Sequence, residues 1–237
     1  MQNGEKIKLN ATDITTFRYC PRQYYYSRVE KRESPPNEHL VRGTLVHSLY
    51  QEFFKRKLFE AAEKDPSYYE WFLTTGIDRM MEKENGRINK LGMNHPTLKR
   101  FLIAAVHRLL ESFKAGTIKE PSLMEHKVEN EDFVARIDTI FEKEDGLAIG
   151  DVKIKLRELE SVKLQLAVAA IILESMGKKV EKGLAISAED WKEIEFPLED
   201  SLKEEVMDIR SKILQMHETK EKPACVCGRC DLQFNVF

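Results

Sequence analysis

Apolar residues in the first half of the chain recur every three or four positions, which is the spacing of amphipathic helices. The pattern predicts helices over residues 43–64, around 68–83 and over 95–116. The expected buried stripes are Leu45, Leu49, Phe53 and Leu58 in the first helix and Phe101, Ala105, Leu109 and Phe113 in the last. Residues 12–32 read as a helix interrupted near Pro21, or as two short helices. The consecutive prolines in residues 33–38 predict a loop.

From about residue 119 the pattern changes to the alternation of β-strands. "SLMEHKVEN", "FVARIDTIFE" and "LAIGDVKIK" read as strands, and "KEDG" (residues 143–146) as a hairpin turn between the last two. A helix is expected over residues 160–179, followed by two more strands and a final helix from about residue 199. This order predicts one α/β domain, in which helices flank a mixed sheet (about 119–198) and a helical section (about 39–118) precedes it.

The composition narrows the class of protein. The 237 residues, of which 42% are hydrophobic, suffice for one large globular domain. No apolar run reaches the roughly 18 residues of a membrane helix, and the polar N-terminus lacks a secretory signal, so we expect a cytoplasmic protein without membrane contact. The formal net charge of -2 means that any contact with nucleic acid must come from a local basic patch.

The segment "ARIDTIFEKEDGLAIGDVKIK" carries candidate chemistry. Because side chains alternate along a strand, Asp151 and Lys153 project from the same face, and the hairpin brings Asp138 toward them. Two carboxylates form an oxygen site suited to Mg²⁺ or Mn²⁺, and a lysine can orient an attacking water or stabilise charge on a phosphate. Asp-x-Lys on a strand is usually a solvated charge pair, but here the apolar "LAIG" precedes it, as in a buried strand.

The four cysteines lie near the two ends of the chain: Cys20 in "RYCPRQYYY", and Cys225, Cys227 and Cys230 in "CVCGRC". In a cytosolic chain, clustered cysteines are more typical of metal binding than of disulfides. Four thiolates can hold zinc or an iron–sulfur cluster. One distant cysteine plus a compact trio differs from the paired Cys-x-x-Cys spacing of structural zinc sites. Ligation would close a loop of about two hundred residues and so stabilise the fold.

Two further features occur in order with these residues: Gly43-x-x-x-His47 at a helix start, and Gln165 in the helix after the Asp-x-Lys strand. The whole set resembles the RecB-like branch of the PD-(D/E)XK nucleases. More narrowly, the chain is similar to the stand-alone iron–sulfur exonucleases associated with CRISPR loci. The resemblance extends from "ATDITTFRYCPRQYYY" to "CVCGRC", which is nearly the whole chain.

The resemblance implies a restriction-endonuclease-like core and a set of site residues. Asp138 and Asp151 match the two metal-binding acids, and His47 matches the histidine that joins them, with help from the Val152 carbonyl. A nitrogen ligand would tilt the preference from Mg²⁺ toward Mn²⁺. Lys153 matches the catalytic lysine. On its own, His47 would read as a packed helix histidine.

Gln165 matches the helix glutamine that positions the lysine or the DNA. The chain departs from the branch four residues later, where Ala169 replaces the usual tyrosine, and this puts the rate or the strand handling in question. The second acid is Asp rather than the commoner Glu, and Ala135 stands where a glycine is frequent. Glu125, on the strand before Asp138, is a candidate accessory acid. Surface strand glutamates are common, so we leave it outside the principal set.

For the cysteines, the resemblance implies a structural [4Fe–4S] cluster that joins residues 12–32 to residues 199–237, with zinc or a smaller cluster as alternatives. The segment around Cys20 is rich in Arg and Lys, interleaved with four tyrosines. Basic groups bind phosphates and rings stack on unpaired bases, which makes Arg18 and Arg22 the expected DNA contacts. Packing of Tyr24 and Tyr25 around the cysteines is the alternative to stacking.

Together these features predict a metal-dependent deoxyribonuclease that cuts single-stranded DNA or trims overhangs. The resemblance further implies that it acts in CRISPR spacer acquisition, with the integrase as its partner. One alternative is a DNA-binding or integrase-associated assembly subunit with weak catalysis, motivated by Ala169 and the modest charge. Another is a RecB-like repair nuclease outside CRISPR. A homo-oligomeric ring would suit processive trimming.

Overall fold

The sheet contains six strands in a computed structural model that describes residues 7–33, 37–156, 159–230 and 234. The strands are β1 (Leu9–Asn10), β2 (Leu123–Glu129), β3 (Phe133–Lys143), β4 (Gly146–Lys153), β5 (Val180–Ser187) and β6 (Lys192–Pro197). β3 runs antiparallel to β2 and β4, β4 runs parallel to β5, and β5 antiparallel to β6. The predicted hairpin is confirmed, because Lys143 pairs with Gly146 across a two-residue turn. β1 pairs with β3 and was not predicted, since two residues show no alternation.

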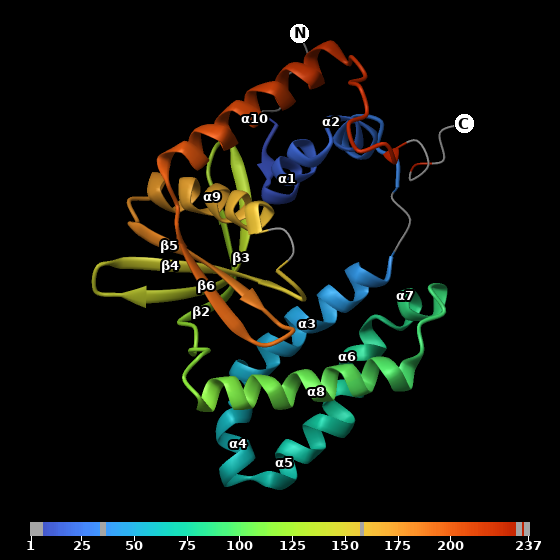
Figure 1. The fold of residues 1–237 in the computed structure, drawn as a ribbon, viewed down its shortest axis with the longest axis vertical. Coiled ribbons are helices and arrows are strands. Elements are labelled where there is room, and N and C mark those ends of the chain that lie inside the picture. Colours follow the sequence, from blue (N-terminus) through green and yellow to red (C-terminus); the bar gives the residue numbers. More distant parts are fainter. Residues whose placement is uncertain (1–6, 34–36, 157–158, 231–233, 235–237) are drawn as a thin grey trace.

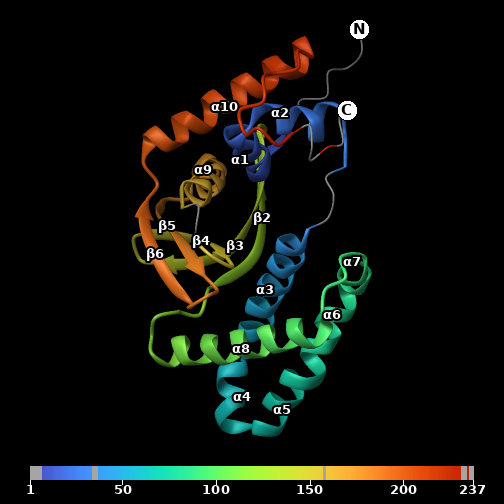
Figure 2. The ribbon, with the colours of Figure 1, turned by 45° about the vertical axis from the view of Figure 1, so that its right-hand side comes forward.

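Helices cover the sheet and build the separate helical section. They are α1 (Ala11–Tyr19), α2 (Pro21–Tyr24), α3 (Glu38–Lys55), α4 (Leu58–Lys64), α5 (Pro66–Trp71), α6 (Ile77–Lys83), α7 (Asn85–Lys90), α8 (His95–Lys114), α9 (Leu159–Ser175) and α10 (Asp200–Thr219). Two π-helical turns, Tyr25–Val29 and Phe72–Gly76, continue α2 and α5. Figures 1 and 2 show α9, α10 and α1 on one side of the sheet and α3 to α8 on the other. The predicted fold class and element order are therefore confirmed.

Two helix predictions need correction. The helix expected over residues 43–64 is two helices, α3 and α4, because Lys57 adopts a left-handed conformation (φ 49°) that ends the first one. The stripe expected on α8 is rotated, since Phe101 and Phe113 are only partly buried. The buried positions of α8 are instead Leu98, Leu102, Ala105, Val106 and Leu109.

Two hydrophobic cores lie on opposite faces of the sheet. The cysteine-side core contains α1, α9, α10 and Cys20, and Ile149 of β4 points into it. The helical core contains α3 to α8, and Val152 of β4 points into it. Trp191 is fully buried in the helical core, where it stacks on Tyr50 at 5.6 Å and donates a hydrogen bond to the Ala105 carbonyl. The site residues on β4 therefore stand between two well-packed layers. Among the described residues, no helix is long and apolar enough to cross a membrane.

Candidate active site

A gap in strand pairing opens the site. Residues 135–138 of β3 lie between the segment that pairs with β1 (residues 133–134) and the segment that pairs with β4 (residues 139–143). A cavity of about 440 Å³ lies beside this gap, between β3, β4 and the helices α1 and α9. β3 still pairs with β2 on its other edge, so only this edge is open, and side chains from both faces of the sheet, His47 of α3 and Gln165 of α9, line the cavity there.

Asp138 stands at the end of this gap. Its Oδ2 accepts a 2.7 Å hydrogen bond from the Val152 N–H and lies 3.3 Å from His47 Nδ1 of α3. Burial alone would raise the pKa of Asp138, but the bonds from His47 and Val152 outweigh burial and hold the pKa below its ordinary value. Burial likewise lowers the pKa of His47, but the hydrogen bond to Asp138 outweighs it and raises the pKa. Asp138 is therefore an ionised carboxylate, and Val152 contacts it through its N–H.

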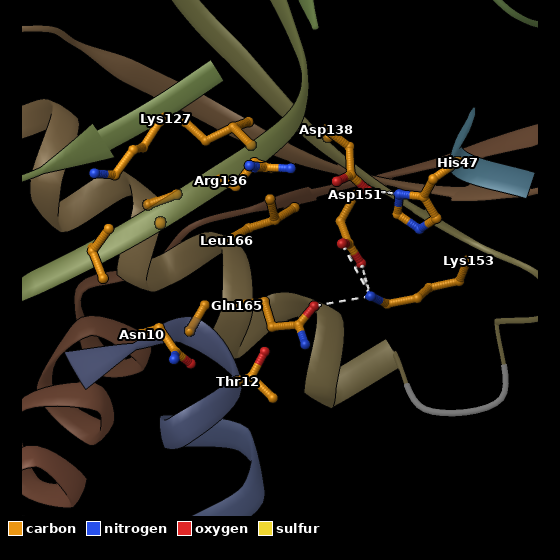
Figure 3. A pocket seen from close by; sticks show the side chains of 16 residues that line it. Asn10, Thr12, His47, Lys127, Arg136, Asp138, Asp151, Lys153, Gln165 and Leu166 are labelled. Atoms are coloured by element: carbon orange, nitrogen blue, oxygen red, sulfur yellow. Dashed lines mark hydrogen bonds and ion pairs between the residues drawn. The ribbon is translucent and has the colours of Figure 1, made fainter. Parts of the chain in front are cut away.

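Asp151, Lys153 and Gln165 form a second group of contacts beside Asp138 (Figure 3). Lys153 Nζ lies 3.0 Å from Asp151 Oδ1 and 2.8 Å from Oδ2, and it donates a 3.0 Å hydrogen bond to Gln165 Oε1 of α9. Burial raises the pKa of Asp151 to about 6, although Lys153 acts in the opposite direction. The ammonium group is thus fixed between a strand and a helix.

Glu125 is the residue that the sequence analysis left outside the principal set. The β2–β3 register pairs Met124 with Thr139 and His126 with Ile137, which places Glu125 across from Asp138. One ligand atom each of His47, Glu125 and Asp138 lie within 4.8 Å of one another. The sequence did offer one signal for Glu125, namely its position on the strand that precedes Asp138. The alternation of side chains along a strand did not distinguish it from other glutamates exposed on strands.

A second cavity, of about 790 Å³, adjoins the first between α3, α8 and the sheet. The two cavities share His47, Arg136, Asp138 and Lys153 in their linings. The second is also lined by Arg42, whose guanidinium lies 5.6 Å from the centre of the Phe101 ring. The candidate residues therefore stand where two open spaces meet.

The four cysteines form a separate site at the far end of the molecule. Their sulfurs all lie within 4.8 Å of one another, with Cys20 3.3 Å from Cys230 and Cys227 3.1 Å from Cys230. Backbone N–H groups, chiefly that of Cys230, lower the pKa of Cys225 to about 6. Burial raises the pKa of Cys230. Four converging thiols are the donor set of zinc or of an iron–sulfur cluster, so a soft metal centre fits these residues.

The tyrosines near Cys20 pack inside the protein. Tyr24, Tyr25 and Tyr26 are buried, and the hydroxyl of Tyr24 bonds His217 of α10 at 2.9 Å. Packing is therefore the correct alternative for Tyr24 and Tyr25, because both are buried and their hydroxyls bond the C-terminal end of α10, at His217 and at the Lys220 carbonyl that follows it. Tyr19 remains exposed.

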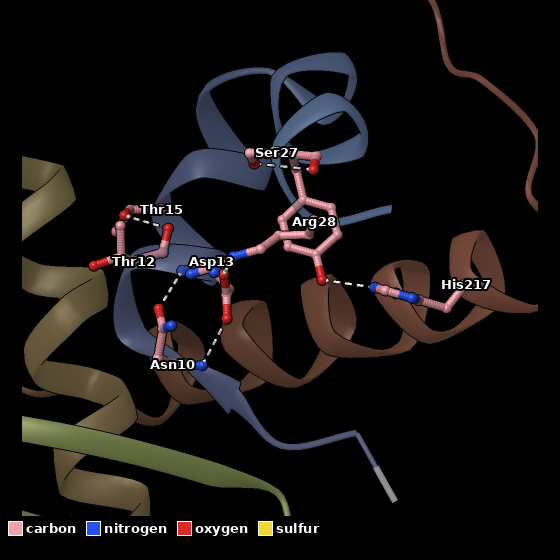
Figure 4. A network of polar contacts seen from close by, with 8 residues as sticks. Asn10, Thr12, Asp13, Thr15, Ser27, Arg28 and His217 are labelled. Atoms are coloured by element: carbon pink, nitrogen blue, oxygen red, sulfur yellow. Dashed lines mark hydrogen bonds and ion pairs between the residues drawn. The ribbon is translucent and has the colours of Figure 1, made fainter. Parts of the chain in front are cut away.

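The basic residues of the same segment already have partners. Arg28 pairs with Asp13, which also closes the capping box at the start of α1 (Figure 4). Arg18 lies on the surface, 2.6 Å from Glu205. Arg22 is partly buried, with its guanidinium 6.0 Å from the Tyr26 ring. Arg18 is thus the more open of the two predicted DNA contacts.

The fold and the site together define a class of protein. A mixed sheet presents two acids and a lysine beside an unpaired strand edge, and these are the groups that a metal-dependent phosphodiester hydrolase needs to hold its ion and stabilise charge. The family comparison agrees: the model of the PD-(D/E)XK nuclease superfamily matches residues 8–233, and the chain belongs to this superfamily. It is therefore a nuclease of a metal-dependent class. No curated protein matches the chain. The oxygen donors of Asp138 and Asp151, with a nitrogen of His47, fit Mg²⁺ or Mn²⁺.

Proposed function

We propose that this chain is a deoxyribonuclease that trims single-stranded DNA or overhangs, of the CRISPR-associated RecB-like iron–sulfur type. The observation that carries the proposal is the position of Lys153. Its ammonium group contacts Asp151 and Gln165 at 2.8 and 3.0 Å beside an ionised Asp138, where two cavities meet. This arrangement matches the chemistry of phosphodiester hydrolysis, in which a water must be aligned with a phosphate whose charge increases.

The site residues divide the chemistry between them. Asp138 and Asp151, with His47, would hold the divalent ion, which when bound activates water and offsets the charge of the phosphate. Lys153 holds the attacking water in line and stabilises the negative charge of the transition state. Gln165 fixes the direction of the lysine, because its Oε1 accepts one of the three ammonium protons.

The surroundings support a nucleic-acid substrate. Four basic side chains, Lys127, Arg136, Arg42 and Lys155, line the two cavities that meet at Lys153. Each of the four pairs with a glutamate, and such surface pairs are weak, so a phosphate can replace the carboxylate as the partner of these basic groups. Phe101 beside Arg42 adds a ring that can stack on an unpaired base. A single strand that crosses from one cavity to the other would bring a phosphate past Lys153, and Arg18 and Arg22 would contact it further away.

The cysteine site supports the finer assignment. Cys20 and Cys230 are fully buried and lie 210 residues apart, so the site links the first helix to the tail. A [4Fe–4S] cluster held there would be structural, because it lies apart from Lys153 at the far end of the molecule. The same assignment implies a cytoplasmic protein that works with a CRISPR integrase and that can form a homo-oligomer.

One observation favours a second candidate function. Ala169 lines the smaller cavity beside Gln165, where the resembling branch carries tyrosine. A missing hydroxyl at this position is consistent with a DNA-binding assembly subunit of low activity, or with a repair nuclease of different strand handling.

The test is cleavage of end-labelled single-stranded DNA by anaerobically purified protein, with and without Mn²⁺. Asp151→Ala is the inactive variant, and Asp145→Ala, an exposed aspartate of the same hairpin, is the matched control. We expect Mn²⁺-dependent shortening that Asp151→Ala abolishes and Asp145→Ala retains. Absence of cleavage by folded protein that binds the same DNA would refute the nuclease and favour the assembly subunit.

A further inference from the structure

Glu125 has an unusual backbone conformation for a strand residue. Its φ is 51°, in the left-handed region that a residue with a side chain rarely adopts. The ladder between β2 and β3 has paired residues on both sides of it, and Glu125 faces Asp138 across the two strands. Strand pairing alone does not require a left-handed backbone conformation at this position. The inversion places a carboxylate at the candidate site.

The carboxylate of Glu125 is placed as a metal ligand would be. It belongs to the set, with His47 and Asp138, whose ligand atoms all lie within 4.8 Å of one another. Ligands on opposite sides of an ion with bonds of about 2.1 Å are about 4.2 Å apart, so small side-chain movements would complete the set. All three residues line the larger cavity, and Asp151 lines only the smaller one.

The contacts made by the acids also differ. Both oxygens of Asp151 contact Lys153, at 3.0 and 2.8 Å. Glu125 instead accepts a 3.2 Å bond from Arg136, whose side chain is 70% exposed, and such an exposed pair is weak. A cation can therefore replace Arg136 at Glu125 at little cost, and Arg136 is then free to contact a phosphate.

We propose that Glu125 is a further ligand of the divalent ion, which binds on the side of Asp138 that faces the larger cavity. This inference rests on the proposed function, because it concerns the same ion. The ion then lies where the two cavities meet: His47 of α3, Glu125 of β2 and Asp138 of β3 bind it from the larger cavity, and Asp151 of β4 binds it from the smaller one.

The test is Mn²⁺ binding to the purified protein, measured by electron paramagnetic resonance of the free ion and by calorimetry. Glu125→Gln removes the charge, and Glu129→Gln, an exposed glutamate of the same strand, is the matched control. Glu125→Gly is the second variant, because glycine adopts the left-handed conformation without strain and so preserves the strand. Circular dichroism checks that each variant is folded.

We expect both Glu125 variants to bind Mn²⁺ at least fivefold more weakly than the wild type, and Glu129→Gln to bind within twofold. A weakening of less than fivefold in a folded Glu125 variant would overturn Glu125 as a ligand and leave the nuclease proposal standing. Absence of Mn²⁺ binding to the wild-type protein would overturn both. The two failures are therefore distinguishable.

Discussion

Replacement of Cys20 by serine tests the link between the two ends of the chain. Cys20 meets Cys230 across 210 residues, whereas the other three cysteines lie within six residues of one another. A metal centre held by all four sulfurs therefore closes a loop of 210 residues, and Cys20 is the ligand that closes it. Cys20→Ser leaves the trio intact but opens the loop.

The loss can be estimated from the length of the loop. Treated as a cross-link, closure of 210 residues removes conformational entropy from the unfolded chain worth about 5 kcal/mol at 25 °C. Typical domains are stable by about 5–15 kcal/mol, so Cys20→Ser would remove a large share of the free energy of unfolding. Cys225→Ser leaves Cys20 opposite Cys227 and Cys230, so a centre retained on these three still closes the loop. We expect it to cost less.

The assay is anaerobic urea denaturation followed by far-UV circular dichroism, on protein with its metal centre and on protein stripped by a chelator. Without the metal centre, the difference in unfolding free energy between wild type and Cys20→Ser measures the packing cost of serine at a fully buried position. With the metal centre, any additional difference between the two proteins measures loop closure. We expect an excess of about 5 kcal/mol. An equal cost of Cys20→Ser in loaded and stripped protein would refute the proposed link.

Three further predictions concern the active site. Gln165→Leu removes the hydrogen bond to the Lys153 ammonium, which is worth about 1.5–3 kcal/mol, so we expect kcat/KM for DNA cleavage to fall about ten- to a hundredfold. Asp151 has its pKa raised from 3.8 to about 6, so its contribution to stability is complete below about pH 4 and is lost as the pH rises through about 6. Metal binding requires the opposite, ionised form, so Mn²⁺ affinity measured by calorimetry should fall as the pH drops below about 6. Gly150→Ala would place a Cβ 2.3 Å from Thr139 Oγ1, and we expect thermal denaturation to show a loss of about 1–3 kcal/mol.

Each of these has a result that contradicts it. Unchanged kcat/KM in Gln165→Leu would show that the contact with Lys153 does not matter in the transition state. A pH dependence of Mn²⁺ affinity that is identical in Asp151→Asn would assign the titration to another group. If adding Thr139→Ala does not restore stability to Gly150→Ala, the clash with Thr139 is not its cause.

Strand alternation and turn chemistry explain why Asp138 and Asp151 could be located from the sequence. A two-residue hairpin fixes its own register, so residues on its two strands face each other predictably. Glu125 could not be ranked in the same way, because its inverted backbone depends on contacts across the sheet rather than on neighbouring residues. The end of α3 before Lys57 was also missed, because no glycine or proline in the sequence marks a helix end there. The burial of Tyr24 could not be decided from the sequence, because the helix that covers it, α10, contacts it through His217, about 190 residues further along the chain.

The division into two cores has a consequence for spectroscopy. Both tryptophans of the chain, Trp71 and Trp191, belong to the helical core, whereas Tyr24 and Tyr26 belong to the cysteine-side core. Tryptophan fluorescence therefore reports on one face of the sheet and circular dichroism on the whole fold. A variant that loosens only the cysteine side would lose helical signal before its fluorescence changes. The difference between the unfolding midpoints seen by circular dichroism and by tryptophan fluorescence would measure how independently the two layers unfold.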